Sequence, residues 1–407
     1  MVWSLLGDHL TDTVTAKGTE WSRRCLLMLA PYPGVPSPIP KLVKPLVCAL
    51  ESLGWEIDNA PWGRHREAER SVAKVLGRTM DLVRVLSQLR SGAYSVLFVH
   101  TATDWRSLIR DLPLLFVAPR SVGRVLLFHG SGPYWLANPG HHLFKLATRA
   151  RLSLSDSLLL LSTQDMDQWM RFYPSGHFQV VANAFVGVDQ AQRSGRATQD
   201  VGARPTLLFV GRLMAEKGVC DLLEAFVQVR SQIDCRLVMV GDGPLAGELR
   251  RRAVQLEVDD SVDFTGYLAE PELSEVYSHA NVFVLPTYTE GFPTVILEAM
   301  SFGLPIVTTS VGGAPDHLTE GENALYVPLR QPKALADVLI GLLGDQSLRE
   351  ILGENNRRKV DDFAPMRVVG AYARVLDEVA ELSVTRSLLL RDRLAGFKAC
   401  WLARRMR

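Results

Sequence analysis

Short apolar segments alternate with helix-like amphipathic segments along this chain, and that alternation limits what it can fold into. The first series contains "CLLMLA", "YSVLFVH", "RVLLFHG", "SLLLLS" and "FQVVAN", and a helical pattern runs from Lys41 to Leu53 after the first of them. Strands that alternate with helical segments form parallel sheets with crossover helices on their faces. The first half of the chain is therefore predicted to be a doubly wound α/β domain.

The same alternation restarts after a polar stretch. The stretch "VDQAQRSGRATQDVGARP", Val188 to Pro205, has almost no apolar residues and is typical of a linker. After it come "TLLFVG", "CRLVMVG", "SVDFTGY", "NVFVLP" and "PIVTT". We therefore expect two Rossmann-like domains, residues 1–190 and 206–365, joined by a linker over 191–205. A ligand would bind in the cleft between them, outside the carboxyl ends of the strands.

Composition narrows the function classes. The 45 basic and 44 acidic residues nearly cancel, so no nucleic-acid partner is indicated. The five cysteines are scattered and form no Cys-x-x-Cys pair, which favours a reducing cytosol. No uncharged run is long enough to span a bilayer, and Asp8, Asp12 and Glu20 lie where a signal peptide would be apolar. A cytoplasmic location is expected.

Two loops that follow predicted strands in the second half of the chain contain candidate ligand-binding residues. In "GRLMAEKG", Gly211 permits a tight turn, and Arg212 and Lys217 offer cations to a diphosphate; the alternative is that both are solvated loop charges. No Walker pattern is present. In "VGDGPL", Gly243 lies in a turn and Asp242 is expected to cap the next helix, which is ordinary chemistry for such a loop.

The stretch "EGFPTVILE" indicates a helix N-terminus. Pro293 suits the first helical position, so the N–H groups of Thr294 and Val295 would lie at the positive end of the helix, where a phosphate can bind. Glu298 leans back toward that end. The opposite face is expected to enter the core, through Ile296, Ala299 and Met300.

Two carboxylates near a phosphate site need an explanation. Glu290 and Glu298 would be repelled by a diphosphate, but they can accept hydrogen bonds from hydroxyl groups of a ribose on one side and of a sugar on the other. That combination is typical of a nucleotide-sugar. The alternative is a loop-end charge and an exposed helical glutamate.

Taken in order, "GRLMAEKG", "VGDGP", "EGFPTVILE" and "GGAPDHLTEGENALYV" resemble the nucleotide-sugar domain of retaining GT-B enzymes of glycosyltransferase family 4, over Thr206 to Phe363. The resemblance implies that Arg212 and Lys217 hold the donor diphosphate, Glu298 the ribose, and Glu290 the sugar hydroxyls. It also places three further residues on the donor side: Gly243, Thr294 and Val295. It implies no metal and no cofactor besides the nucleotide-sugar.

The first half resembles the family less closely. His129 in "RVLLFHG" corresponds to a histidine that faces the sugar, and the resemblance implies that His129 and Glu290 are the catalytic residues; the alternative for His129 is a structural histidine. Gly34 in "PYPGVPSPIPK" corresponds to a glycine-rich loop, although the prolines make this loop stiffer. Asn183 in "VANAFV" stands where a hinge or donor residue is expected.

The resemblance implies a glycosyltransferase, similar to hexosyltransferases, with a helix that crosses back to the first domain. It would move a sugar from a nucleotide-diphosphate-sugar to a hydroxyl of a glycan or lipid-linked acceptor with retention, in bacterial cell-surface polysaccharide or glycolipid synthesis. A nucleotide-sugar epimerase of the same fold and a non-catalytic nucleotide-sugar-binding protein remain alternatives.

The C-terminal region, residues 366–407, combines a crossover segment with a basic amphipathic tail. Met366 to Leu382 can form the crossover. Beyond it, an apolar stripe lies among six cations: Leu390, Leu394, Phe397 and Trp401, with Arg391, Arg393, Lys398, Arg404, Arg405 and Arg407. This pattern favours peripheral contact with an anionic membrane at its inner face, and packing on the protein is the alternative.

Overall fold

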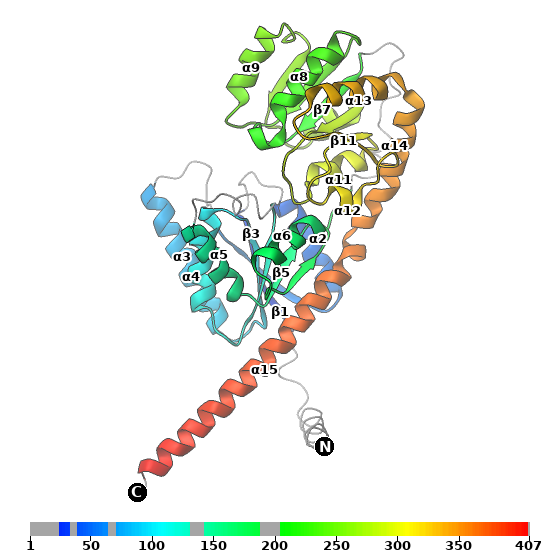
Figure 1. The fold of residues 1–407 in the computed structure, drawn as a ribbon. Coiled ribbons are helices and arrows are strands. Elements are labelled where there is room, and N and C mark those ends of the chain that lie inside the picture. The colour runs from blue at the N-terminus through cyan, green and yellow to red at the C-terminus, as the bar shows by residue number, and fades with distance from the viewer. Residues whose placement is uncertain (1–23, 33–38, 64–70, 131–141, 188–203, 406–407) are drawn as a thin grey trace.

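Two six-stranded sheets, one in each half of the chain, form the framework of the protein (Figure 1). The computed structural model describes residues 24–32, 39–63, 71–130, 142–187 and 204–405, with the backbone alone for 71–76 and 390–405. All strand pairings within the two sheets are parallel. The predicted α/β class and the two Rossmann-like sheets are confirmed. Most of the predicted linker, residues 188–203, lies outside the described residues.

The first sheet has the strand order β2-β1-β3-β4-β5-β6. Its strands are β1 (Cys25–Ala30), β2 (Glu56–Pro61), β3 (Val96–Thr101), β4 (Gly123–Phe128), β5 (Ser157–Leu160) and β6 (Phe178–Val180). Its helices are α2 (Ile39–Ser52), α3 (Ser71–Arg90), α4 (Trp105–Val117), α5 (His142–Ser153) and α6 (Thr163–Phe172).

The second sheet has the order β12-β11-β10-β7-β8-β9, so the chain reverses its direction across the sheet between β7 and β10. Its strands are β7 (Thr206–Val210), β8 (Arg236–Val240), β9 (Val262–Gly266), β10 (Val282–Leu285), β11 (Ile306–Thr308) and β12 (Ala324–Tyr326). Its helices are η2 (Ala215–Lys217), α8 (Val219–Arg230), α9 (Ala246–Gln255), α10 (Glu272–His279), α11 (Thr294–Ser301), α12 (Ala314–His317), α13 (Pro332–Gly344), α14 (Gln346–Lys359) and η3 (Val360–Phe363).

The strands of the first sheet bury side chains on both faces. Leu26 and Met28 of β1 join one apolar cluster with α2, whereas Leu27 and Leu29 join another with α3, α4 and α5. This alternation follows from the period of two along a strand. A parallel sheet covered by helices on both faces requires apolar strands such as "CLLMLA".

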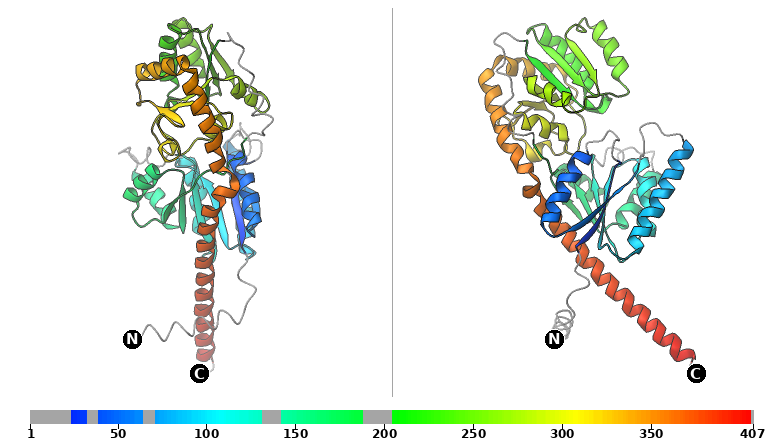
Figure 2. Two further views of the ribbon diagram at one scale, coloured as in Figure 1. Left: turned by 90° about the vertical axis from the view of Figure 1, so that its right-hand side faces the viewer. Right: turned by 180° about the vertical axis from the view of Figure 1, so that it is seen from behind.

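The last helix, α15 (Pro365–Arg405), connects the two halves. It is one continuous helix that begins beside the second sheet, crosses the first sheet and extends past it (Figure 2). The Tyr372 hydroxyl donates to the Ala182 carbonyl at 2.9 Å, and Arg386 pairs with Asp156 at 2.5 Å. The predicted crossing helix is therefore present. Within the described ranges, none of the helices combines the length and the apolar character that crossing a bilayer requires.

Candidate functional site

The loops after β7 and β10 meet at the position where the second sheet changes direction. Because β7 and β10 are neighbours, the segments that follow them lie at the same edge of the sheet. Lys217 from the first loop forms an ion pair with Glu290 from the second, and both side chains are mostly buried. In open α/β sheets this edge, at this reversal, is where ligands bind. Two residues predicted for the donor site are thus brought together.

Gly218 holds the β7 loop against the β10 loop. Its φ of 67° lies in the left-handed region, and a Cβ added there would lie 2.0 Å from the Pro286 carbonyl oxygen. Only glycine suits such a conformation at such a close approach. The Tyr288 N–H and the Thr287 hydroxyl both donate to the Glu216 carbonyl, at 2.8 and 3.0 Å. The backbone before Glu290 is therefore fixed relative to Lys217.

Arg212 and Gly243 follow the carboxyl ends of β7 and β8, at the same edge of the sheet as Lys217. Arg212 is exposed and has no ion-pair partner among the described residues, so its charge is open to a ligand. Gly243 is constrained by packing, because a Cβ there would lie 2.4 Å from the Leu213 carbonyl oxygen. The expected helix cap at Asp242 is wrong. Helix α9 begins only at Ala246, and the Asp242 carboxylate accepts a bond from the Gly243 N–H at 2.7 Å.

Helix α11 begins at Thr294, and Pro293 occupies the position before it. The Ile296 N–H donates to the Pro293 carbonyl at 3.1 Å, so the N–H groups of Thr294 and Val295 head the helix. The predicted core residues of this helix are buried: Ile296, Ala299 and Met300. The positive end of α11 therefore lies directly after the Glu290 loop.

Glu298 is held by two residues that the sequence motifs did not indicate. Its side chain is 13% exposed; one oxygen accepts from the Tyr277 hydroxyl at 2.9 Å and the other pairs with Lys41 of α2 at 3.2 Å. Lys41 also lies 3.6 Å from Glu270. Burial alone would lower the pKa of Lys41, but the two carboxylates outweigh it and raise the pKa. Each Glu298 oxygen keeps a second lone pair for a hydroxyl ligand.

The loop after β11 supports the Glu290 backbone from the other side. Gly312 has a φ of 57°, and a Cβ there would lie 2.0 Å from the Glu290 carbonyl oxygen. The Gly313 N–H donates to the Gly291 carbonyl at 2.5 Å. The two glycines of "VGGAPDH" therefore allow two backbone segments to touch. They place Glu290 between the loops after β7 and β11.

His129 reaches the same region from the first sheet. It follows β4, and its N–H donates to the Thr101 carbonyl at 3.0 Å. The next residue, Gly130, faces the second half of the chain: a Cβ built on Gly291 would lie 3.7 Å from the Gly130 nitrogen. His129 precedes Gly130 and Glu290 precedes Gly291, so both residues lie on the two segments that approach each other here. The two predicted catalytic residues come from opposite halves of the chain.

A buried histidine, His100 of β3, contacts His129. The His100 Nδ1 and His129 Nε2 atoms are 2.7 Å apart, and the rings stack with centroids 5.0 Å apart. Burial lowers the pKa of His129 to about 4, and burial together with His129 and Arg110 lowers the pKa of His100. Both imidazoles are therefore neutral near pH 7. His100 was not predicted from the sequence, because it lies inside an apolar strand.

The histidine pair predicts a pH-dependent stability. An unfolded histidine titrates near 6.5, and in the folded protein both pKa values are lower, so the pair's contribution is complete above pH 6.5 and is lost as pH falls toward 4. Between pH 6.5 and 5.5 we expect a loss of about 1 kcal/mol per histidine. Urea unfolding of the wild type and of a His100→Gln/His129→Asn variant measures it. The variant should show the smaller pH slope, and equal slopes would contradict this assignment.

Asn183 joins the two halves. It is buried, and its amide donates to the Phe292 carbonyl at 3.0 Å, just before α11. The Phe185 N–H donates to the Phe363 carbonyl at 2.8 Å. The structure therefore places Asn183 in the joint between the halves, with its amide N–H engaged by protein. Gly34 lies outside the described residues.

No group of three or more His, Cys, Asp or Glu side chains that could hold a metal ion occurs in the described part of the chain. The charges that converge at the site are instead those of Arg212, Lys217, Glu290 and Glu298. Two cations and a helix N-terminus can hold a diphosphate, and two carboxylates can accept hydroxyl groups. The site therefore combines anion and hydroxyl recognition.

Comparisons with known proteins indicate which proteins this chain is similar to. Residues 193–359 match the family model described as "Glycosyl transferases group 1". The chain is 32% identical over 174 residues to the capsular polysaccharide biosynthesis glycosyltransferase CapM of Staphylococcus aureus, covering 40% of this chain and 42% of CapM. It is 30% identical over 220 residues to the alpha-D-kanosaminyltransferase of Streptomyces kanamyceticus, covering 52% of this chain and 57% of that protein.

Solved structures share the fold over most of the chain. HepE of Anabaena, crystallised with UDP and glucose, has a TM-score of 0.65 and 17% identity, covering 86% of this chain and 98% of HepE. At this identity the likeness shows the fold alone. The two sequence matches, in contrast, span only about half the length of each relative. Residues 193–359 are therefore similar to the group 1 glycosyl transferases, and the solved structures show that the chain has the GT-B fold.

Proposed function

We propose that the protein is a glycosyltransferase that moves a sugar from a nucleotide-diphosphate-sugar to a hydroxyl of a glycan or lipid-linked acceptor. The observation that carries the proposal is the meeting of Lys217, Glu290 and the start of α11 where the second sheet reverses. The donor diphosphate would lie at Arg212, Lys217 and the N-terminus of α11. Family 4 membership, hexosyl transfer and retention of configuration belong to the same proposal.

The chemistry requires stabilisation of a leaving diphosphate. The acceptor oxygen forms a bond to the anomeric carbon, the bond to the diphosphate oxygen breaks, and the acceptor's proton passes to that departing oxygen. Arg212 and Lys217 would stabilise the negative charge that develops, so metal independence is expected. On this account acceptor entry and nucleotide departure share one face of the sugar, which retains its configuration.

Glu290 and His129 would orient the transferred sugar. Lys217 and Glu290 form an ion pair. A diphosphate bound next to Lys217 would replace Glu290 as the partner of that lysine. Glu290 could then accept sugar hydroxyls. His129 stays neutral because burial lowers its pKa, so it would act through hydrogen bonds to the sugar.

Glu298 would bind the ribose diol. Its carboxylate is oriented by Tyr277 and Lys41, and both oxygens have remaining acceptor capacity. The nearby N-terminus of α11 would lie on the phosphate side of the same nucleotide. With phosphates at the N-terminus of α11, the ribose at Glu298 and the sugar at Glu290, the site suits a ligand that has an anionic centre and hydroxyl groups on both sides.

A role in cell-surface polysaccharide or glycolipid synthesis, at the cytoplasmic face of the membrane, is proposed on two grounds. CapM, which is 32% identical to this chain over 174 residues, is named for capsular polysaccharide biosynthesis. The end of α15 extends past the first sheet (Figures 1 and 2), and its sequence is basic and amphipathic. We propose that this tail contacts an anionic membrane. Its side chains from Leu390 onward lie outside the described residues.

A thermal-shift screen of nucleoside diphosphates and their sugars tests the proposal. A ligand that binds only the folded state raises the melting temperature, by several degrees once its concentration is well above Kd. At least one nucleotide-sugar should shift the wild type, and Glu298→Ala should reduce that shift. The matched control is Glu354→Ala on α14, which should respond as the wild type does. If no nucleotide shifts the protein, the donor site is misassigned.

A further inference from the structure

The outer surface of helix α4 is apolar. Trp105, Ile109, Phe116 and Val117 repeat at helical spacing, and the side chains of Ile109 and Phe116 are 62% and 75% exposed. A surface helix ordinarily presents polar residues to water on this face. Helix α4 also packs between its neighbours, α3 and α5 (Figure 1). An apolar stripe therefore runs along the middle of a three-helix layer.

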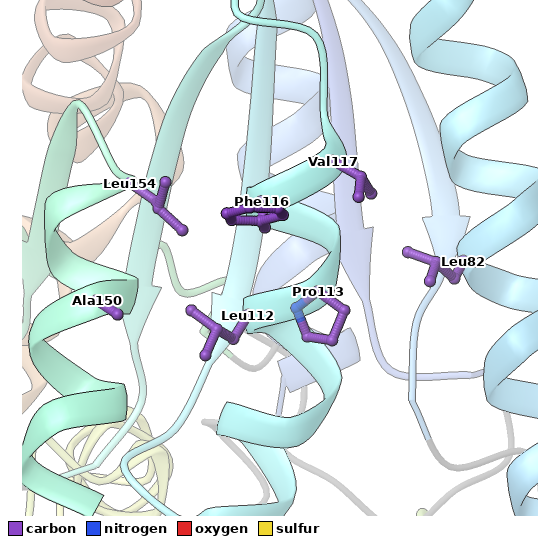
Figure 3. A pocket seen from close by; sticks show the side chains of 7 residues that line it. All are labelled: Leu82, Leu112, Pro113, Phe116, Val117, Ala150 and Leu154. Carbon is purple, nitrogen blue, oxygen red and sulfur yellow. The ribbon is translucent and has the colours of Figure 1, made fainter. Parts of the chain in front are cut away.

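The apolar surface continues onto both neighbours. Both neighbouring helices, α3 and α5, also expose apolar side chains: Met80, Val83, Leu143 and Leu146. Between the three helices lies a pocket of about 400 Å³ lined by seven apolar residues (Figure 3): Leu82, Leu112, Pro113, Phe116, Val117, Ala150 and Leu154. Contiguous exposed apolar surface of this kind marks an interaction site.

Among the described side chains of the same three helices, the exposed charged groups are all cationic. The cations with described side chains are Arg78, Arg84, Arg90, Arg106, Arg110, Lys145, Arg149 and Arg151. Over their whole length these helices contain only two carboxylates, Asp81 and Asp111, and both are buried. Asp81 pairs with Arg84, and Asp111 pairs with Arg110 and lies near the buried Arg151. The outer face of α3, α4 and α5 therefore offers cations and apolar groups, and no exposed carboxylate.

We propose that this α3–α4–α5 face docks on an anionic lipid bilayer. Its apolar side chains would enter the boundary between headgroups and acyl chains, while its exposed arginines, among them Arg90, Arg106 and Arg149, contact anionic headgroups. A second copy of the chain is a poorer partner, because a symmetric contact would bring cations against cations with no exposed carboxylate to pair with them. The docking face is separate from the donor site and does not depend on the proposed transfer reaction.

Vesicle binding by the full chain tests this proposal. Wild-type protein should bind vesicles of phosphatidylglycerol and phosphatidylcholine, and bind pure phosphatidylcholine vesicles much more weakly. Ile109→Glu/Phe116→Glu should lower the partition coefficient by about tenfold or more, because it places charge in the apolar contact. Arg106→Gln/Arg149→Gln should lower it by about fivefold for each charge removed.

A matched control separates this face from general surface effects. Val254→Glu/Ile351→Glu alters two exposed apolar residues of the second half and should bind vesicles as the wild type does. The thermal shift with the nucleotide should persist in every variant, which verifies folding and keeps this test independent of the donor site. Unchanged vesicle binding by Ile109→Glu/Phe116→Glu would overturn the proposal. So would a wild-type dimer in light scattering that this variant dissociates, since the face would then bind a second copy.

Discussion

Replacing Lys217 by alanine is expected to lower kcat/KM for sugar transfer by about 10²–10³-fold. Lys217 lies at the reversal of the second sheet, and Gly218 and the β10 loop fix its position. Removal of one preorganised group that stabilises developing negative charge typically costs a factor of this size. The side chain of Glu290, 13% exposed, would also lose its cationic partner. Steady-state kinetics with the donor from the thermal-shift screen measures the effect.

The kinetic pattern distinguishes this role from a structural one. Because the diphosphate charge grows as the bond to the sugar breaks, kcat should fall more than the affinity for the nucleoside diphosphate. Lys217→Arg should recover part of the rate because it restores the charge. Lys333→Ala, at an exposed position on α13, is the control and should behave as wild type. Equal kcat values for Lys217→Ala and the wild type would exclude Lys217 from the reaction.

Replacing Glu290 by glutamine is expected to lower kcat by about 10²-fold with little loss of nucleoside diphosphate affinity. A carboxylate that positions sugar hydroxyls contributes to orientation in the transition state, and a neutral amide accepts hydrogen bonds less strongly. The substitution also releases Lys217 from its ion pair, which favours diphosphate binding. Single-turnover kinetics and a direct titration with the nucleoside diphosphate measure the two effects.

Glu298→Gln provides the contrast. On our assignment Glu298 contacts the ribose, so this variant should lose affinity for the nucleoside diphosphate, and kcat at saturation should change less. A Glu290→Gln variant that binds the diphosphate as poorly as Glu298→Gln would mean that both carboxylates serve the nucleotide, and the division of roles between them would be wrong.

The strands of the two sheets were predictable from sequence where they are apolar on both faces. "CLLMLA" and "TLLFVG" became β1 and β7, because strands in the interior of a parallel sheet must be apolar. The edge strands β2 and β12 were missed. Half of the β2 sequence "EIDNAP" is exposed and polar, and β12 has only three residues. In β2 the polar residues interrupt the apolar pattern that would identify a strand, and in β12 the apolar run is too short to identify one.

The site was predictable where its residues follow strands in one domain. Lys217 and Glu290 each end a βα loop, and the order of the strands makes those loops neighbours. The contact between Lys41 and Glu298 joins residues 257 positions apart in different halves of the chain. No local pattern encodes such a contact. The predicted helix cap at Asp242 was wrong for a different reason. Three residues separate Asp242 from the start of α9, so its carboxylate precedes the capping position.

Calorimetric titration of the wild type with the nucleoside diphosphate from the screen, in buffer containing EDTA, tests the central claim most directly. We predict one binding site per chain that persists without divalent metal, and a clear loss of affinity in Arg212→Ala and Glu298→Gln. No binding of any nucleoside diphosphate, or binding that neither substitution weakens, would contradict the assignment of the donor site to the β7–β10 edge.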